Sequence, residues 1–181
     1  MEERLRAFFS IEEDVMMRTK VFIVISAGFG LVFAICSRLG FCLQEELSLQ
    51  QKTARAELIV VGTVNNVEAR WDNPTSKSMI NSYVSLSIEE LIKGSPPDKD
   101  ITITVAGGTV DGISAVIEGM PGFFKGEKVL VFLIRDNYSD NFVVLNCRAG
   151  KFSIRRVDNM VGSTGKTLPE FLDEVRLYIT K

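Results

Sequence analysis

The stretch ELIVVGTVNNVEARW, residues 57–71, decides the fold. Its valine and isoleucine content is typical of a long β-strand. Alternate apolar residues lie on one face of this strand as far as Val64 and on the opposite face from Val67 onward. A one-residue shift of this kind needs a β-bulge, which we expect at Asn65 and Asn66.

The next apolar stretch repeats this behaviour. From Ile80 to Ile88, every second or fourth residue is apolar and serines stand between them, and then Leu91 appears out of phase. The change indicates a second bend close to Glu89 and Glu90. Two long, bent strands in succession favour a small closed β-barrel over a flat sheet.

The rest of the chain continues the β pattern and ends in a helix. Residues 129–133 are uniformly apolar, which predicts a strand buried on both faces, and the glycine-rich residues 107–126 read as loops around one short strand. Thr167 and Glu170 have the spacing of a capping box, and an apolar stripe from Leu168 to Ile179 predicts a helix that packs on the barrel. The further strands are expected at residues 101–105, 113–117, 127–135, 142–147 and 151–155.

An uncharged, apolar segment precedes this domain. Residues 21–37 contain no charge and no proline, and Arg18 and Lys20 stand just before them. Extended to residue 43, the segment reaches the ~30 Å needed to cross a bilayer as a helix. Basic residues directly before such a segment favour an N-terminus in the cytoplasm, so everything after residue 43 is expected outside the cytoplasm.

The fate of this segment stays open between three alternatives: a cleaved signal peptide, an uncut transmembrane anchor, or cleavage with lipidation at Cys42. The predicted domains are a cytoplasmic tail or over-extended start at 1–20, a signal or anchor at 21–43, a polar stalk or short helix at 44–55, and the barrel with its C-terminal helix at 56–181. All three alternatives predict an extracytoplasmic barrel that is secreted or membrane-tethered.

Several segments, in this order, resemble a group of secreted bacterial and archaeal domains of unassigned function. More loosely, the same order is similar to the netrin-like module of the tissue metalloproteinase inhibitors, an OB-type barrel. The segments that carry the resemblance are AELIVVGTV (56–64), IEELIKG (88–94), GGTV (107–110), EGMPGF (118–123), GEKVLVFL (126–133) and GKFS (150–153).

The netrin-like resemblance implies one alternative function. In those inhibitors a mature N-terminal cysteine chelates the zinc of the protease, and only Cys42 could take that role here, after cleavage behind Phe41. The chain lacks the family's second nearby cysteine and the cysteines that pair with both, because its cysteines are only Cys36, Cys42 and Cys147. We expect Cys147 to be a small buried side chain at a strand end.

Composition argues against several classes of activity. The chain has no histidine, which excludes the usual catalytic triads and histidine-bearing zinc sites. Its net charge of −2 does not indicate a basic surface for nucleic-acid binding. Glu89 and Glu90 are the obvious pair for a carboxylate-based extracytoplasmic enzyme, but neighbouring side chains on a strand point to opposite faces. We therefore expect no enzyme, no cofactor and no metal.

These observations favour a binding module for an extracytoplasmic protein or other ligand. We expect the ligand to contact the loops at residues 71–79 and 107–124. Because aromatic side chains dominate the energetics of interfaces, Trp71, Phe123 and Phe124 are the candidate binding residues.

Overall fold

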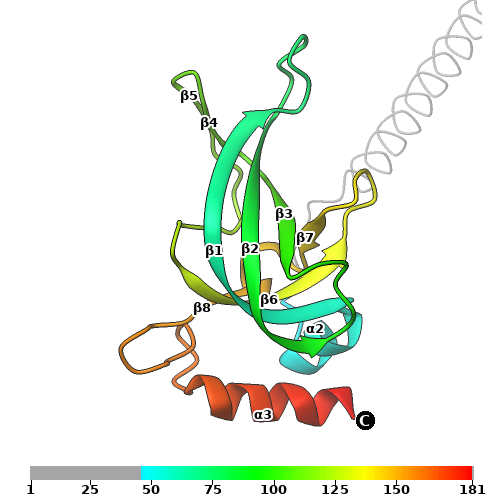
Figure 1. Ribbon diagram of the computed structural model, residues 1–181, viewed down its shortest axis with the longest axis vertical. Helices are drawn as coiled ribbons and strands as arrows, with labels where there is room; N and C mark the ends of the chain where they lie inside the picture. Colours follow the sequence, from blue (N-terminus) through cyan, green and yellow to red (C-terminus); the bar gives the residue numbers. More distant parts are fainter. Residues whose placement is uncertain (1–45, 181) are drawn as a thin grey trace, which may run out of the picture. The chain divides into compact units, whose positions relative to one another are not determined.

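The computed structural model describes residues 46–180 of the chain, and these residues form a β-barrel with two helices at one end (Figure 1). The predicted tail at 1–20, the signal or anchor at 21–43 and Cys42 lie outside the described residues. Within residues 46–180, neither helix has the length and apolar character to span a bilayer.

Five strands close the barrel. Their order is β1-β2-β3-β7-β6, and β6 pairs back to β1. Neighbouring strands are antiparallel except β3 and β7, which are parallel and form a β-bridge only between Ile103 and Phe142. The bounds are β1 Leu58–Trp71, β2 Ile80–Lys93, β3 Asp100–Ala106, β6 Lys128–Arg135 and β7 Phe142–Val144; a short strand, β8 Lys151–Ser153, pairs with β6.

The two bends predicted in the long strands are confirmed. The pairing register of β1 and β2 shifts after Val64, where Asn65 of β1 has no partner on β2. It also shifts after Val61, where Glu89 of β2 has no partner on β1. Each extra residue bends its strand and increases the local twist, which lets β1 and β2 curve around the barrel (Figure 1). Gly62 lies against the neighbouring strand, and a Cβ there would clash with the carbonyl oxygen of Ser87.

Two separate cores explain why β1 and β6 are buried on both faces. Leu58, Val60 and Val64 point into the barrel, whereas Ile59 and Val61 lie in a second core outside it. β6 divides in the same way: residues 129, 131 and 133 face inward and residues 130 and 132 face outward. The prediction of a doubly buried strand at 129–133 is therefore confirmed.

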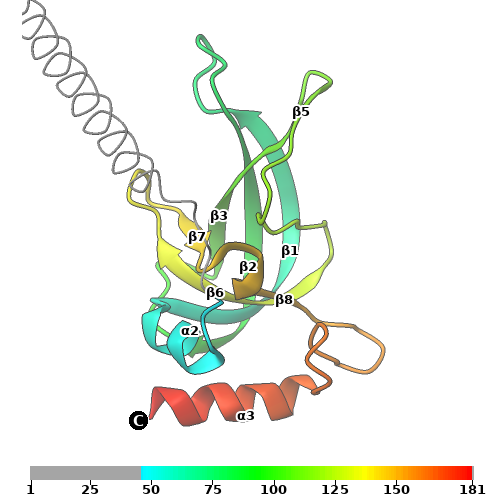
Figure 2. The same ribbon diagram turned by 180° about the vertical axis from the view of Figure 1, so that it is seen from behind.

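The second core lies under the C-terminal helix, α3 Leu168–Ile179, which extends across one end of the barrel (Figure 2). The predicted capping box is present, because the Thr167 hydroxyl and the Glu170 carboxylate satisfy each other's backbone N–H groups. The predicted short helix before the barrel is α2 Leu49–Arg55, which is capped by Ser48. The helical side chains that enter the core are Leu168, Phe171, Leu172 and Val175.

Three sequence expectations differ from the structure. The strand predicted at 113–117 is β5 Ile113–Ala115, which pairs with β4 Gly108–Val110 in a separate hairpin instead of joining the barrel. The strand predicted at 142–147 ends at Val144, because Asn146 and Cys147 adopt positive φ angles of 59° and 51°. Cys147 therefore begins a 3-10 helix, η1 Cys147–Gly150, and is half-buried instead of fully buried.

Candidate functional site

The barrel end opposite α3 carries a cleft. Two cavities of about 440 and 330 Å³ lie there, and they share Val105, Ala106, Met120 and Pro121 as lining residues. The larger cavity lies between the ends of β3 and β7, and the smaller one lies under the β4–β5 hairpin. We call the two together the end cleft.

The loop between β1 and β2 forms one rim of the end cleft through Met79, which is half exposed. The Asp72 carboxylate accepts hydrogen bonds from the backbone N–H of Met79 at 2.9 Å and from the Ser78 hydroxyl at 2.8 Å. These bonds, that from Met79 foremost, hold the pKa of Asp72 below its ordinary value. The loop is thus closed on itself at neutral pH and presents Met79 in a fixed place.

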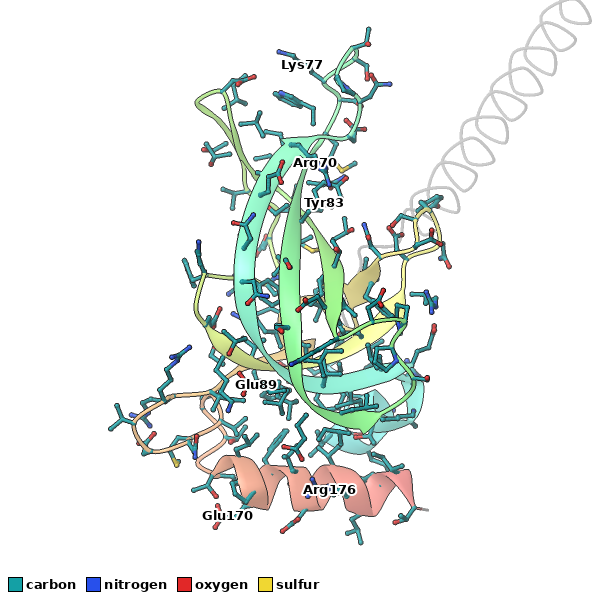
Figure 3. The ribbon with its side chains drawn as sticks, in the orientation of Figure 1. Arg70, Lys77, Tyr83, Glu89, Glu170 and Arg176 are labelled. Carbon is teal, nitrogen blue, oxygen red and sulfur yellow. The ribbon has the colours of Figure 1, made fainter. Side chains whose placement is uncertain are left out.

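The β4–β5 hairpin forms a second rim and lies close against the barrel. A Cβ on Gly108, whose φ is +136°, would lie 2.8 Å from the Cβ of Ala69 and 2.5 Å from the Ser82 hydroxyl. The hairpin tip also approaches the β1–β2 loop, where Lys77 Nζ lies 3.9 Å from a carboxylate oxygen of Asp111. Lys77 is labelled at this end of the molecule in Figure 3.

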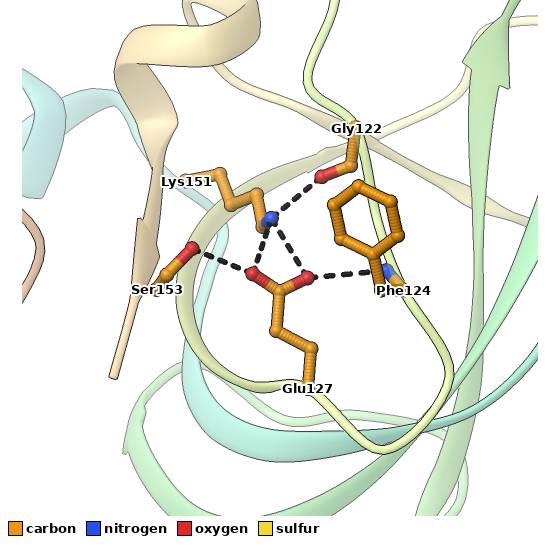
Figure 4. A network of polar contacts seen from close by, with 5 residues as sticks. All are labelled: Gly122, Phe124, Glu127, Lys151 and Ser153. Carbon is orange, nitrogen blue, oxygen red and sulfur yellow. Dashed lines mark hydrogen bonds and ion pairs between the residues drawn. The ribbon is translucent and has the colours of Figure 1, made fainter. Parts of the chain in front are cut away.

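A nearly buried ion pair fixes residues 120–123, which form a wall of the end cleft (Figure 4). Lys151 Nζ donates to the Glu127 carboxylate at 2.7 Å and to the Gly122 carbonyl. The same carboxylate accepts from the Ser153 hydroxyl at 2.6 Å and from the backbone N–H of Phe124. The ammonium also lies 4.7 Å from the centre of the Phe123 ring, which fixes that ring inside the barrel core.

The loop between β6 and β7, residues 136–141, completes the rim. Tyr138 is almost fully exposed at its tip, and the Asp136 carboxylate accepts a hydrogen bond from the Ser139 hydroxyl at 2.6 Å. Asn141 Nδ2 donates to the Thr104 hydroxyl at 3.1 Å, which ties this loop to β3. Among the described residues that line the two cavities, Asp136 is the only charged one, so this lining is largely apolar with one acidic group at its rim.

The three predicted binding residues do not form one surface. Phe123 is buried in the barrel core, where it lines the smaller cavity, and Phe124 is 72 % exposed but lines neither cavity. Trp71 is half-buried under the Lys77 ammonium, 5.8 Å from its ring centre. Cys42 lies outside the described residues, so the inhibitor alternative stays a prediction.

The loops predicted at 71–79 and 107–124 do line the end cleft, but of the three predicted residues only Phe123 contributes. The exposed lining residues are Met79, Val116 and Ile117 from these loops and Tyr138 from the loop 136–141, which is not among the predicted contact loops. A tyrosine in the middle of DNYSDN, residues 136–141, is a signal that the sequence contains, because turn-forming neighbours predict an exposed tip. Cys147 also lines the larger cavity.

The carboxylate pair suggested for an enzyme separates, as the strand geometry predicts. Glu89 accepts from the Thr63 hydroxyl and forms an ion pair with Lys128 at 2.8 Å, whereas Glu90 forms one with Arg176 of α3 at 2.6 Å. The bond from Lys128, followed by that from Thr63, lowers the pKa of Glu89. Figure 3 shows Glu89 and Arg176 toward the α3 end and Lys77 at the opposite end, and neither glutamate lines the end cleft. Residues 46–180 contain no cluster of three metal-binding side chains.

Comparison with known proteins adds no assignment. No protein-family model matches the chain, and no curated protein matches it significantly.

Proposed function

We propose that this protein is an extracytoplasmic binding module of OB type, secreted or membrane-tethered, whose ligand occupies the end cleft. The observation that carries the proposal is the apolar cleft itself, which four separate segments build at one end of the barrel. Small-molecule and peptide sites are usually concave, mostly apolar and equipped with a few polar groups, and the end cleft has this composition.

The strand order supports the OB-type assignment. Numbered along the barrel, β1, β2, β3, β6 and β7 close in the order 1-2-3-5-4-1, with a parallel contact between the third and fifth strands. OB-folds bind their ligands on strands 2 and 3 and between the loops that join strands 1–2 and 4–5. Those loops are the ones that carry Met79 and Tyr138 in this chain. Residues 107–126 contain no helix, unlike the usual OB connection.

Export is proposed from the sequence. The basic residues Arg18 and Lys20 before an uncharged segment favour an N-terminus in the cytoplasm and a barrel outside it. Protease added to intact cells that express the full chain is expected to digest the barrel or to find it already in the medium. A barrel that is degraded only after cell lysis would contradict this part of the proposal.

The methionines provide a direct test of the cleft. Met79 and Met120 line it, whereas Met160 lies near the start of α3, bridged to Thr167. In the full chain with ¹³C-labelled methionine methyl groups, we expect indole, a small probe of apolar clefts, to shift the signals of Met79 and Met120 and to leave that of Met160 unchanged. Equal shifts at all three, or none, would reject the end cleft as a binding site.

A further inference from the structure

We propose that the end cleft binds an extended peptide segment of a partner protein. The segment adds as a strand to the edge of β3 at Thr104–Ala106, beyond the bridge to β7. This inference rests on the proposed function, because it concerns the same cleft, and it names the class of ligand. The partner segment is apolar at alternate residues and is neutral or basic.

The unpaired strand edge lies where β3 and β7 separate, and we call the line between these two strands the seam. Their parallel pairing consists of a single bridge between Ile103 and Phe142, and beyond it the larger cavity separates Thr104–Ala106 from Val143 and Val144. A strand edge that leaves its pairing in this way presents backbone groups to whatever enters the space beside it.

The register shows which backbone groups face the seam. Gly107 N donates to Ile80 O at 2.8 Å, and Ile88 N donates to Lys99 O at 2.9 Å, so the odd-numbered residues of β3 exchange hydrogen bonds with β2. In an antiparallel pair the residues between them turn both backbone groups to the opposite edge. The N–H and C=O of Ala106 therefore face the end cleft, past the last bridge to β7.

The cleft wall suits alternate side chains of an extended peptide. Met79, Met120 and Pro121 offer apolar contacts beside Ala106, and an added strand places every second side chain toward them. Main-chain hydrogen bonds together with pockets for alternate side chains are the recognition mode of strand addition.

Charge favours a neutral or basic peptide over nucleic acid. Within residues 46–180, Asp136 is the only charged residue in the cleft lining, and Asp140 follows in the same exposed loop. Two carboxylates at the rim repel a phosphate backbone and attract a lysine or arginine side chain.

The test uses the full chain with ¹³C-labelled methionine and the peptide acetyl-KVTVT-amide. We expect this peptide to shift the signals of Met79 and Met120 but not that of Met160. Acetyl-EVTVT-amide is expected to bind about two- to fivefold more weakly, as a surface charge contact implies. N-methylation of the peptide amides one at a time should weaken binding at every second position only, because alternate N–H groups face β3.

A variant of the edge provides the matched control. Ala106→Pro removes the N–H that faces the seam, and we expect it to weaken peptide binding about five- to tenfold, the effect of one main-chain hydrogen bond. Ala106→Ser keeps that N–H and is therefore expected to bind the peptide more tightly than Ala106→Pro does. Thermal melts followed by the fluorescence of Trp71, which lines neither cavity, should show that both variants are folded.

The outcomes separate the two proposals. If indole shifts Met79 and Met120 but the peptides do not, or if N-methylation at all positions is equally tolerated, strand addition is wrong and the cleft remains a binding site. A uridine octanucleotide that shifts those signals where the peptides fail, or a shift that depends on protein concentration alone, would assign the cleft to nucleic acid or to a second copy and overturn the inference. If indole also fails, both proposals fall.

Discussion

The Lys151–Glu127 ion pair allows a quantitative prediction about the wall of the end cleft. The two side chains are only 9 % and 16 % exposed, so Lys151→Met leaves a nearly buried carboxylate without its cation. Removal of one partner of a buried pair costs about 3–5 kcal/mol, and we expect the lower value, about 3 kcal/mol, because Ser153 and the Phe124 N–H still donate to Glu127.

This loss of unfolding free energy corresponds to a decrease in the melting temperature, Tm. With an unfolding entropy of about 2.1 cal/mol/K per residue, the described domain has about 0.28 kcal/mol/K, so Lys151→Met is expected to lower Tm by about 10 °C. The fluorescence of Trp71, the only tryptophan in the chain, reports the transition in a thermal melt of the full chain. The control is Lys166→Met, since the side chains of the Lys166–Glu174 pair are 47 % and 31 % exposed, far more than those of Lys151 and Glu127, and this change is expected to leave Tm nearly unaltered.

A double variant sharpens the test. Methionine at both 127 and 151 removes the uncompensated charge and should recover most of the loss, because buried ion pairs contribute little net stability beyond apolar replacements. If Lys151→Met lowers Tm no more than Lys166→Met does, the pair does not hold residues 120–123, and the account of this wall is wrong.

Three further predictions concern the barrel itself. Phe171→Ala removes a ring that is 4 % exposed in the core under α3, and urea unfolding should show a loss of about 3–5 kcal/mol. Both Gly108 and Gly112 have positive φ, so alanine at either position is strained by about 1–2 kcal/mol. Gly108→Ala should destabilise the protein clearly more than Gly112→Ala in the same assay, because of the two only Gly108 has neighbours that a Cβ would clash with. The pKa of Glu89 is lowered by Lys128, so its stabilising effect is full above the ordinary value of 4.5 and is lost as the pH falls through the lowered pKa. Urea midpoints measured from pH 6 down to pH 2 should therefore fall less for Glu89→Gln than for the wild type.

Local patterns in the sequence predict the barrel strands well. A phase change in side-chain alternation depends only on the chain itself, so the sequence alone locates the bulges at Asn65 and Glu89. The capping box at Thr167 and Glu170 is equally local, and its prediction is confirmed.

The end cleft is not predictable in the same way, because it depends on contacts between distant segments. Phe123 and Phe124 are neighbours in sequence, yet the ammonium of Lys151 fixes the first in the core while the second is exposed. Gly107 and Gly108 predict a break in the strand pattern, and the Asp-Gly pair at 111–112 is a hairpin signal that the sequence contains. Both residues of that turn have positive φ, 52° and 77°, but the close approach of Gly108 to Ala69, which places the hairpin on β1, depends on a distant segment.

Site-specific photocrosslinking in intact cells tests the central claim, that the end cleft is where this protein meets its ligand. Tyr138 and Val157 are 96 % and 95 % exposed, but only Tyr138 lies on the cleft. With benzoylphenylalanine at each position in turn, the account predicts a discrete adduct from position 138 and none from position 157. Adducts of equal yield from both positions, or from position 157 alone, would contradict it.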